Sequence, residues 1–133
     1  MYYIYIMILP ILTIAPSHNR GRGVFATEAI EINTTIEIAP VIVLNKEHRH
    51  IVEQTLLFDY IFEWGEDHQM AAVGLGYVSI YNHAVQPNCR YEMDYENQTI
   101  SIITIQSIAK GEELFINYNA ETDQQSPVWF EHH

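Results

Sequence analysis

The sequence predicts a mainly β domain of many short strands with little helix. Its 133 residues fit one domain and leave little room for a second. Runs of β-branched and aromatic residues recur along the chain, and glycine, proline, asparagine and aspartate separate them. Few segments repeat apolar residues at the spacing of an amphipathic helix. We therefore interpret residues 1–133 as a single domain of short strands and turns.

The apolar N-terminal segment, MYYIYIMILPILTIAP, is expected to form one or two buried strands, because isoleucine and tyrosine favour strands over helices. It lacks the basic start and the clear small-residue cleavage site that a signal peptide has. Pro10 interrupts it before the roughly 20 residues that a membrane helix needs. A membrane segment is the less favoured alternative.

Strands are expected next at Val24–Ala26, Thr35–Ile38 and Val41–Leu44. The Ala39-Pro40 step should end the second of them, because proline cannot donate a hydrogen bond to a neighbouring strand. From Glu47 onward the apolar spacing is mixed. We expect a loop or short helix there, and then a strand over Leu57–Trp64.

In the second half, residues 74–90 combine glycines, aromatics and polar groups without a clean period. Such a stretch favours a functional loop or a short helix that carries a site. Tyr91–Tyr95 and Thr99–Gln106 alternate around Glu96-Asn97-Gln98, which predicts a hairpin. A last strand is expected at Glu113–Tyr118, followed by an acidic tail with two aromatic residues.

The chain is acidic, with 6 lysines and arginines against 17 acidic residues and a formal charge of −11. This charge repels phosphate backbones, which disfavours direct nucleic-acid binding, and attracts basic partners such as a lysine-rich tail. The alternative is that the charge only keeps the protein soluble. Cys89 is the only cysteine, so the chain can form neither an internal disulfide nor a cysteine-cluster zinc site. A reducing cytoplasm is the expected compartment.

Three short segments have patterns that suit a ligand site. In GRG at Gly21–Gly23, two glycines let the backbone approach a ligand closely. In NHAVQPN at Asn82–Asn88, an asparagine amide can pair with a base edge or a carboxylate. In GEELFINY at residues 111–118, a turn leads into a strand that ends on a tyrosine. Taken singly, the three are more typical of a tight turn, of turn-forming or satisfied core polar residues, and of a packing tyrosine than of a ligand site.

The ordered combination of GxG, NHxxxPN and GEExxxxY resembles the SET-domain protein lysine methyltransferases, over about Ile11 to Asn119. The resemblance implies several small curled β-sheets around a knot-like C-terminal crossing near the NHxxxPN loop. It also implies S-adenosylmethionine as methyl donor, S-adenosylhomocysteine as product, and no metal. Residues 120–133 are a tail that is expected to help close the site.

By motif position, the resemblance assigns each site residue a role. For donor binding it implies Gly21, Arg22, Gly23, Tyr81, Asn82, His83, Tyr118 and, from the tail, Trp129. Tyr118 and Tyr77 are the expected catalytic residues, and Tyr60 and Tyr77 the expected lining of a lysine channel. For the three tyrosines outside the motifs (60, 77 and 81), a role in the core is the alternative.

These residue types suit methyl transfer from a sulfonium to an amine. A lysine ammonium, with an ordinary pKa near 10.4, must first lose its proton, and a desolvating aromatic channel favours that loss. Tyrosine rings also attract alkylammonium groups, by about 0.5–2 kcal/mol each. We expect the Tyr118 hydroxyl to orient the amine or polarise the methyl group rather than act as a general base.

Three positions depart from the family pattern: Ser79, Ala84 and Asn117 replace a frequent arginine, serine and aspartate. None of them removes a group that the mechanism requires. Many eukaryotic members also close the site with a zinc-binding cysteine cluster, which this chain lacks, so the aromatic tail residues are expected to take its place. The alternative for that tail is a disordered segment or a dimer contact.

The rival interpretation is a non-catalytic SET-like module that binds basic peptides or the methyl donor. A third, in which the motifs are coincidental, is a small structural β-protein. The expected partner is a basic, lysine-containing protein, such as a histone-like or ribosomal one, and no membrane. The sequence also allows a homodimer. The expected location is a bacterial cytoplasm, or the nucleus or host nucleoid if the substrate is histone-like.

Overall fold

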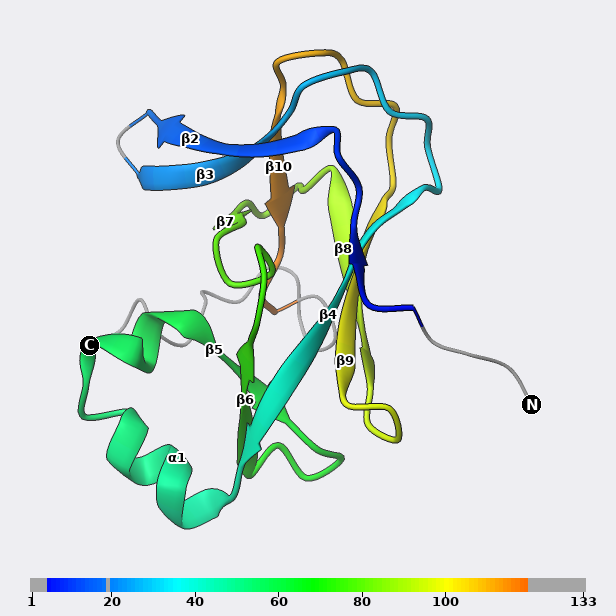
Figure 1. The fold of residues 1–133 in the computed structure, drawn as a ribbon. Helices are drawn as coiled ribbons and strands as arrows, with labels where there is room; N and C mark the ends of the chain where they lie inside the picture. The colour runs from blue at the N-terminus through cyan, green and yellow to red at the C-terminus, as the bar shows by residue number, and fades with distance from the viewer. Residues whose placement is uncertain (1–4, 19, 120–133) are drawn as a thin grey trace.

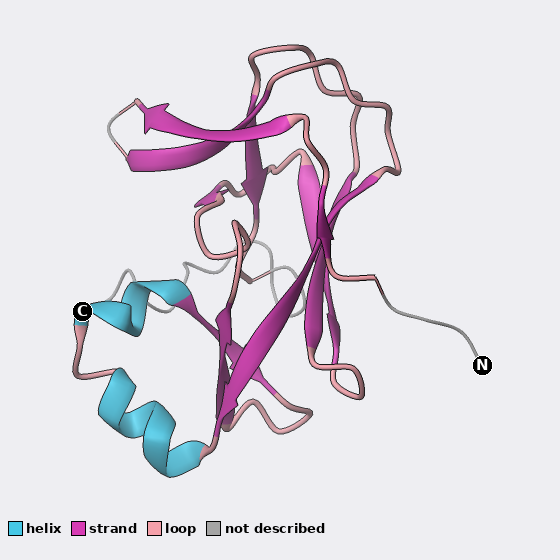
Figure 2. Cartoon of the chain, viewed as in Figure 1, coloured by secondary structure: helices cyan, strands magenta, loops and turns pink. Residues whose placement is uncertain are grey.

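Two β-sheets and one short α-helix make up the part of the chain that the structure, a computed structural model, describes: residues 5–18 and 20–119 (Figures 1 and 2). The larger sheet has the order β5-β6-β4-β9-β8, with β1 beside β4. Its strands are β1 Met7–Ile8, β4 Thr35–Leu44, β5 Ile61–Trp64, β6 Met70–Gly74, β8 Cys89–Asp94 and β9 Thr99–Thr104. The smaller sheet has the order β2-β3-β10-β7, with β2 Leu12–Ser17, β3 Gly21–Ala26, β10 Glu113–Ile116 and β7 Asn82–His83. The expectation of a mainly β fold with little helix is confirmed.

The N-terminal segment forms strands, as expected, but they are not buried ones. In β1 and β2 the only buried residue is Leu12, while Ile8 is exposed. The reason is position, because β1 is a two-residue strand beside β4 and β2 is an edge of the smaller sheet. Within the described ranges, no helix has the length and apolar character needed to cross a membrane.

Strand β4 continues through the Ala39-Pro40 step, so the prediction that this step ends the strand is wrong. The strand changes partner there: Pro40 is the last residue paired with β9, and Val41 is the first paired with β6. The proline carbonyl still accepts a hydrogen bond from the Leu75 amide at 2.9 Å. Its missing N–H interrupts no ladder, because β6 ends at Gly74.

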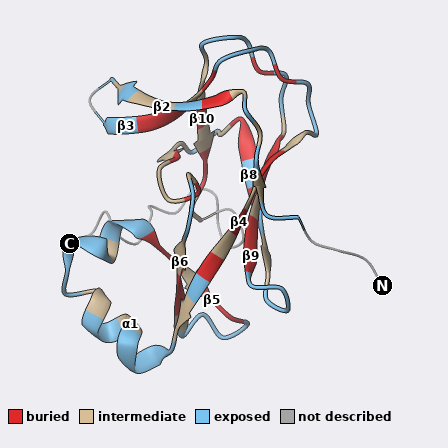
Figure 3. Ribbon diagram, in the orientation of Figure 1, coloured by how far each residue is buried: buried red, intermediate tan, exposed pale blue. Residues whose placement is uncertain are grey.

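A short helix precedes β5, and it occupies more of the segment than the sequence suggested. Helix α1, Lys46–Val52, begins where the Asn45 side chain accepts a hydrogen bond from the His48 amide at 2.8 Å. A 3₁₀ helix, η1 Leu56–Tyr60, then takes the first half of the expected strand, which begins only at Ile61. Neither helix buries a residue, and both lie at the edge of the larger sheet (Figure 3).

The predicted hairpin of β8 and β9 is confirmed, with Asp94 paired to Thr99 across its turn. The Asp94 carboxylate accepts hydrogen bonds from the Asn97 amide and side chain, and Gln98 takes a left-handed conformation with φ of 55°. One apolar cluster joins the two sheets; its most deeply buried members include Val24, Ile36, Val78, Ile100, Ile102, Leu114 and Ile116. This shared core fixes the smaller sheet against the larger one.

Candidate active site

The three motifs lie on three adjacent strands of the smaller sheet. Strand β10 is central: it pairs antiparallel with β3, where Leu114 opposes Val24, and parallel with β7, where Ile116 opposes His83. The chain after β10 is held against the NHxxxPN loop, since Asn117 donates from Nδ2 to the Val85 carbonyl at 3.2 Å. Segments between about 30 and 90 residues apart in sequence thus meet at one place.

Asn88, the last residue of NHxxxPN, fixes this crossing. Its side chain donates to the Glu113 carbonyl at 2.9 Å and accepts from the Phe115 amide at 2.8 Å, so it hydrogen-bonds the backbone of β10 as a neighbouring strand would. It also donates to the Glu112 carboxylate at 3.1 Å. The asparagine of this motif is therefore structural, and it sets where β10 runs relative to the loop.

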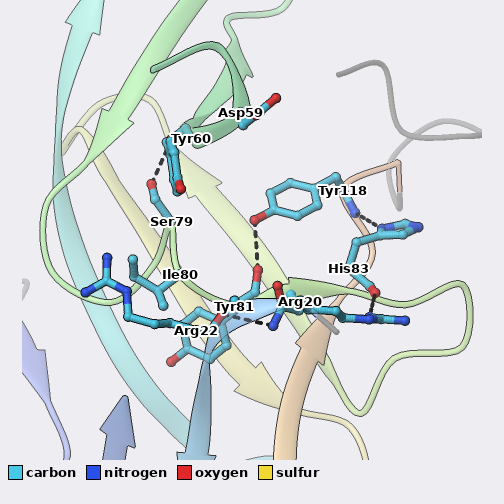
Figure 4. A pocket seen from close by; sticks show the side chains of 11 residues that line it. Arg20, Arg22, Asp59, Tyr60, Ser79, Ile80, Tyr81, His83 and Tyr118 are labelled. Carbon is cyan, nitrogen blue, oxygen red and sulfur yellow. Dashed lines mark hydrogen bonds between the residues drawn. The ribbon is translucent and has the colours of Figure 1, made fainter. Parts of the chain in front are cut away.

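A cavity of about 760 Å³ opens beside the three strands, within the range of small-molecule sites. It is lined by Arg20, Gly21, Arg22, Asp59, Tyr60, Ser79, Ile80, Tyr81, Asn82, His83 and Tyr118. Figure 4 shows Asp59 and Tyr60 at one end and the two arginines at the other, with Tyr118 between them. The lining therefore combines backbone of the glycine turn, both residues of the NH pair and the strand-end tyrosine.

Asn82 is held in one orientation by a partly buried carboxylate. Its Nδ2 donates to Glu113 Oε2 at 2.8 Å and to the Arg22 carbonyl at 3.1 Å. Glu113 Oε1 accepts from the Ser17 hydroxyl at 2.7 Å. Because both amide hydrogens point to these acceptors, the oxygen of Asn82 is left as the group that can serve a ligand. Within the described residues, that oxygen accepts no hydrogen bond.

Gly23 makes this arrangement possible. A Cβ at this position would lie 2.2 Å from Glu113 Oε2 and 2.8 Å from Asn82 Nδ2, closer than atoms can approach. Gly23 is buried and does not line the cavity, whereas Gly21 and Arg22 do. The structure thus gives the second glycine of GxG a packing role behind the cavity wall.

His83 is fixed from two directions. Its carbonyl accepts a hydrogen bond from the Arg20 guanidinium at 2.6 Å, and that guanidinium also lies 5.4 Å from the ring centre of Phe115. Its ring nitrogen Nδ1 accepts from the Tyr118 amide at 3.3 Å, and the His83 and Tyr118 rings are stacked with centroids 6.1 Å apart. The histidine therefore connects β7 to the strand-end tyrosine.

Tyr118 places a phenol at the centre of the cavity. Its hydroxyl donates to the Tyr81 carbonyl at 2.9 Å, while its own carbonyl accepts from the Tyr91 hydroxyl at 2.9 Å (Figure 4). The Phe62 ring packs against it with centroids 5.3 Å apart. Burial, followed by the nearby Tyr91 and Tyr60 phenols, raises the pKa of Tyr118 above its ordinary value. The phenol thus keeps its proton and is unsuited to act as a general base.

The structure brings most of the predicted site residues together. Those that line the cavity are Gly21, Arg22, Tyr60, Tyr81, Asn82, His83 and Tyr118. Tyr77, predicted as a catalytic and channel residue, is not among the lining residues; it is partly buried and packs against the core. The cause is the hydrogen bond from its amide to the buried Glu37, which turns this part of the loop inward. Trp129 lies outside the described residues.

Sequence reasoning missed Arg20, Asp59 and Ile80 as lining residues, and treated Ser79 only as a departure from the family pattern. Arg20 is the neighbour of the GRG motif and Ile80 is close to Asn82, so the motif surroundings could have indicated both. Asp59 was hidden because η1 was predicted as a strand. Among the described residues, no group of three or more metal-ligand side chains lies close together.

Comparisons with known proteins identify the family of this chain. A family model described as the SET domain matches residues 21–119. A Schizosaccharomyces pombe protein named "Histone-lysine N-methyltransferase, H3 lysine-37 specific" is 39% identical over 121 residues, covering 90% of this chain and 77% of that protein. A crystal structure of a candidate histone methyltransferase from Plasmodium falciparum superimposes with a TM-score of 0.66 at 27% identity, covering 92% of this chain and 99% of that one. A Chaetomium thermophilum Polycomb Repressive Complex 2 structure shares the fold, with a TM-score of 0.67 at 22% identity over 88% of this chain and 16% of that one.

Proposed function

This chain belongs to the SET-domain family of protein lysine methyltransferases, close to histone methyltransferases, and we propose that it methylates a lysine in a histone tail. The observation that supports catalysis most directly is the hydrogen bond between the Tyr118 hydroxyl and the Tyr81 carbonyl inside the cavity. It places a protonated phenol and a carbonyl oxygen together, next to the residues of the GxG and NH motifs.

SET domains use S-adenosylmethionine, which supplies an electrophilic methyl group on a sulfonium. The residues present fit such a ligand. The Asn82 oxygen, which no described residue hydrogen-bonds, suits an amino or ammonium group, and the fixed His83 backbone suits a base edge. We propose that Asn82 and His83, with the backbone of Gly21 and Arg22, hold the donor.

The remaining cavity residues suit the lysine side. Tyr60 and Asp59 come from η1, which is exposed, so they stand where a peptide can approach. A phenol ring and a carboxylate both attract a lysine side chain, and the overall charge of −11 favours encounter with basic tails. Inside, the carbonyl of Tyr81 and the ring of Tyr118 orient the amine once it is neutral, and burial keeps water away from it.

Histone H3 is the first substrate to test, because the Schizosaccharomyces pombe relative carries an H3 lysine specificity in its name. The experiment is radiolabelled methyl transfer to the four recombinant core histones, followed by mass spectrometry of the labelled one. We expect label on one histone lysine, lost when that lysine is replaced by arginine. Labelling of non-histone basic proteins with none on histones would overturn the histone assignment and leave the family assignment intact.

A histone substrate also requires that the protein reach chromatin, so we propose a nuclear rather than a cytoplasmic location. Fractionation of the source cells with an antibody to the chain tests this.

A homodimer remains the expected alternative to a monomer, and sedimentation of the purified protein with and without the donor distinguishes the two states.

A further inference from the structure

We propose that Glu37 is a positioning residue for methyl transfer: its carboxylate holds the loop at residues 76–81 so that the Tyr81 carbonyl meets the Tyr118 hydroxyl. The inference rests on the proposed catalytic role of that pair. Neither the sequence motifs nor the cavity lining includes Glu37, which lies on β4 behind the cavity wall.

Glu37 occupies a position at which an apolar residue would be ordinary. Its side chain is 0% exposed, and its strand neighbours on either side are Ile8 of β1 and Ile102 of β9. A carboxylate is rarely buried completely unless it is well partnered, because leaving water costs it hydration energy. The burial of this one therefore calls for a specific use.

The partners of Glu37 all come from one loop. Oε2 accepts a hydrogen bond from the Tyr77 amide at 2.7 Å, and the Val78 amide donates to the same carboxylate. Oε1 accepts from the Tyr81 hydroxyl at 3.1 Å. Gly76 passes so close, at φ of 114°, that a Cβ there would lie 2.6 Å from Oε2. The loop is wrapped around the carboxylate and fastened to it at both ends.

The same loop forms the catalytic side of the cavity. After Val78 it supplies Ser79, Ile80 and Tyr81 to the lining, and the Tyr81 carbonyl accepts the Tyr118 hydroxyl at 2.9 Å. The next residues, Asn82 and His83, are held separately by pairing with β10. Loss of the Glu37 contacts should therefore displace the carbonyl of Tyr81. It should leave the donor side of the cavity, formed by Asn82 and His83, in place.

The ionised form of Glu37 is the one that fits its partners. Burial raises its pKa to about 7, against the lowering effect of the hydrogen bonds from Tyr77, Tyr81 and Val78. The titratable groups around Glu37 and its partner Tyr81 are the Tyr77 phenol and the Cys89 thiol. Burial raises the pKa values of Tyr81 and Cys89, so both keep their protons. The residues paired with Glu37 on the neighbouring strands are uncharged: Ile8 on β1 and Ile102 on β9. A proton on Glu37 would occupy one of its two accepting oxygens, so the loop contact made by that oxygen would have to rearrange.

The test compares Glu37→Gln with the parent and with Glu63→Gln, a matched control on β5 whose partner is Arg49 outside the main cavity. We expect kcat to fall at least about tenfold in Glu37→Gln, as misplacement of reacting groups costs. The donor Kd measured by calorimetry should stay within about threefold, or roughly 0.6 kcal/mol, because Asn82 and His83 are held separately by pairing with β10. The parent-to-Gln ratio of kcat should shrink as pH falls through 7, where the parent carboxylate also becomes neutral. Glu63→Gln should retain kcat within about twofold.

A kcat within about twofold of the parent in Glu37→Gln, or a donor Kd that worsens as much as kcat, overturns the inference. If Glu37→Gln does not fold, Tyr81→Phe replaces it, because this change removes one hydrogen bond to the carboxylate and keeps the Tyr81 carbonyl. It should lower kcat severalfold, and an unchanged kcat overturns the inference.

A spectroscopic measurement separates this inference from the histone assignment. Amide signals of Tyr77 and Val78 in the parent should shift with a midpoint near pH 7 and stay constant in Glu37→Gln. If no histone is methylated, the substrate proposal fails, and these signals still judge Glu37: Tyr77 and Val78 signals at the same positions in the parent and in Glu37→Gln at the assay pH overturn the inference.

Discussion

Two carboxylates support opposite sides of the cavity, and they differ in surroundings and in what they hold. Glu37 is completely buried, accepts from backbone amides and a phenol, and fixes the Tyr81–Tyr118 side. Glu113 is partly exposed, accepts from a hydroxyl and an amide side chain, and fixes Asn82. The difference matches the roles we propose: one acid aligns the groups around the transferred methyl, and the other sets the acceptor that a bound donor meets.

The largest effect should come from the catalytic side. Tyr118→Phe removes the hydroxyl that meets the Tyr81 carbonyl and leaves the ring stacked on His83. We expect kcat to fall about 100-fold while donor Kd stays nearly unchanged, because alignment is lost but donor contacts remain. Single-turnover methyl transfer and calorimetric titration measure the two quantities. A parallel loss of donor affinity would show that the two sides are not separable.

Asn82→Ala should show the opposite pattern. It removes the oxygen available to the donor and leaves the Glu113 carboxylate without its amide partner. A hydrogen bond to a charged group, such as the ammonium group of the donor, is worth about 1.5–3 kcal/mol. The donor Kd should therefore weaken roughly 10- to 100-fold. The rate at saturating donor should change far less. Calorimetry with S-adenosylmethionine and S-adenosylhomocysteine measures the loss, and parental affinity would refute the assignment of Asn82.

Gly23→Ala tests whether the Glu113 carboxylate orients Asn82 for the donor. The new Cβ must displace the Glu113 carboxylate, which turns the Asn82 amide out of position. We expect donor Kd to weaken about tenfold and overpacking to lower the free energy of unfolding by about 1–3 kcal/mol. Gly111→Ala is the matched control: a Cβ there meets nothing within 4 Å, though its φ of 87° makes the backbone strained. A loss of stability without a loss of donor affinity in Gly23→Ala would mean that Glu113 does not orient Asn82.

The last prediction concerns the pH dependence of stability, which changes gradually rather than through a substitution. Folding raises the pKa of Glu37 from 4.5 to about 7, so between these values the folded chain keeps a proton that the unfolded chain releases. Stability from this group is therefore full below pH 4.5 and falls as pH rises toward 7, by about 1 kcal/mol for each pH unit. Urea unfolding of the parent and of Glu37→Gln at pH 5, 6 and 7 measures the difference. A difference that stays constant over this window would contradict the raised pKa.

These two carboxylates also show where sequence reasoning works and where it stops. The β8–β9 hairpin was predictable because its turn chemistry and its alternation are local. The motifs indicated five of the eleven lining residues, Gly21, Arg22, Asn82, His83 and Tyr118, because the residues of a motif lie close together in the chain. Alternation in Thr35–Ile38 would place Glu37 opposite Ile36, on an exposed face, yet both are 0% exposed. β4 is covered on both faces at Ile36 and Glu37, and only the paths of distant segments determine that.

The inner strand of the smaller sheet has a consequence for the order of assembly during synthesis. β10 separates β3 from β7, so β7 has no neighbour in the smaller sheet and β3 has only β2 until residue 116 has left the ribosome. The larger sheet needs nothing beyond β9, and its hairpins pair nearby segments. Contacts between segments far apart in sequence form late, because closing a long loop costs entropy before any contact repays it. We therefore expect a nascent chain to pair the larger sheet first and to complete its donor site last, when β10 joins β3 and β7.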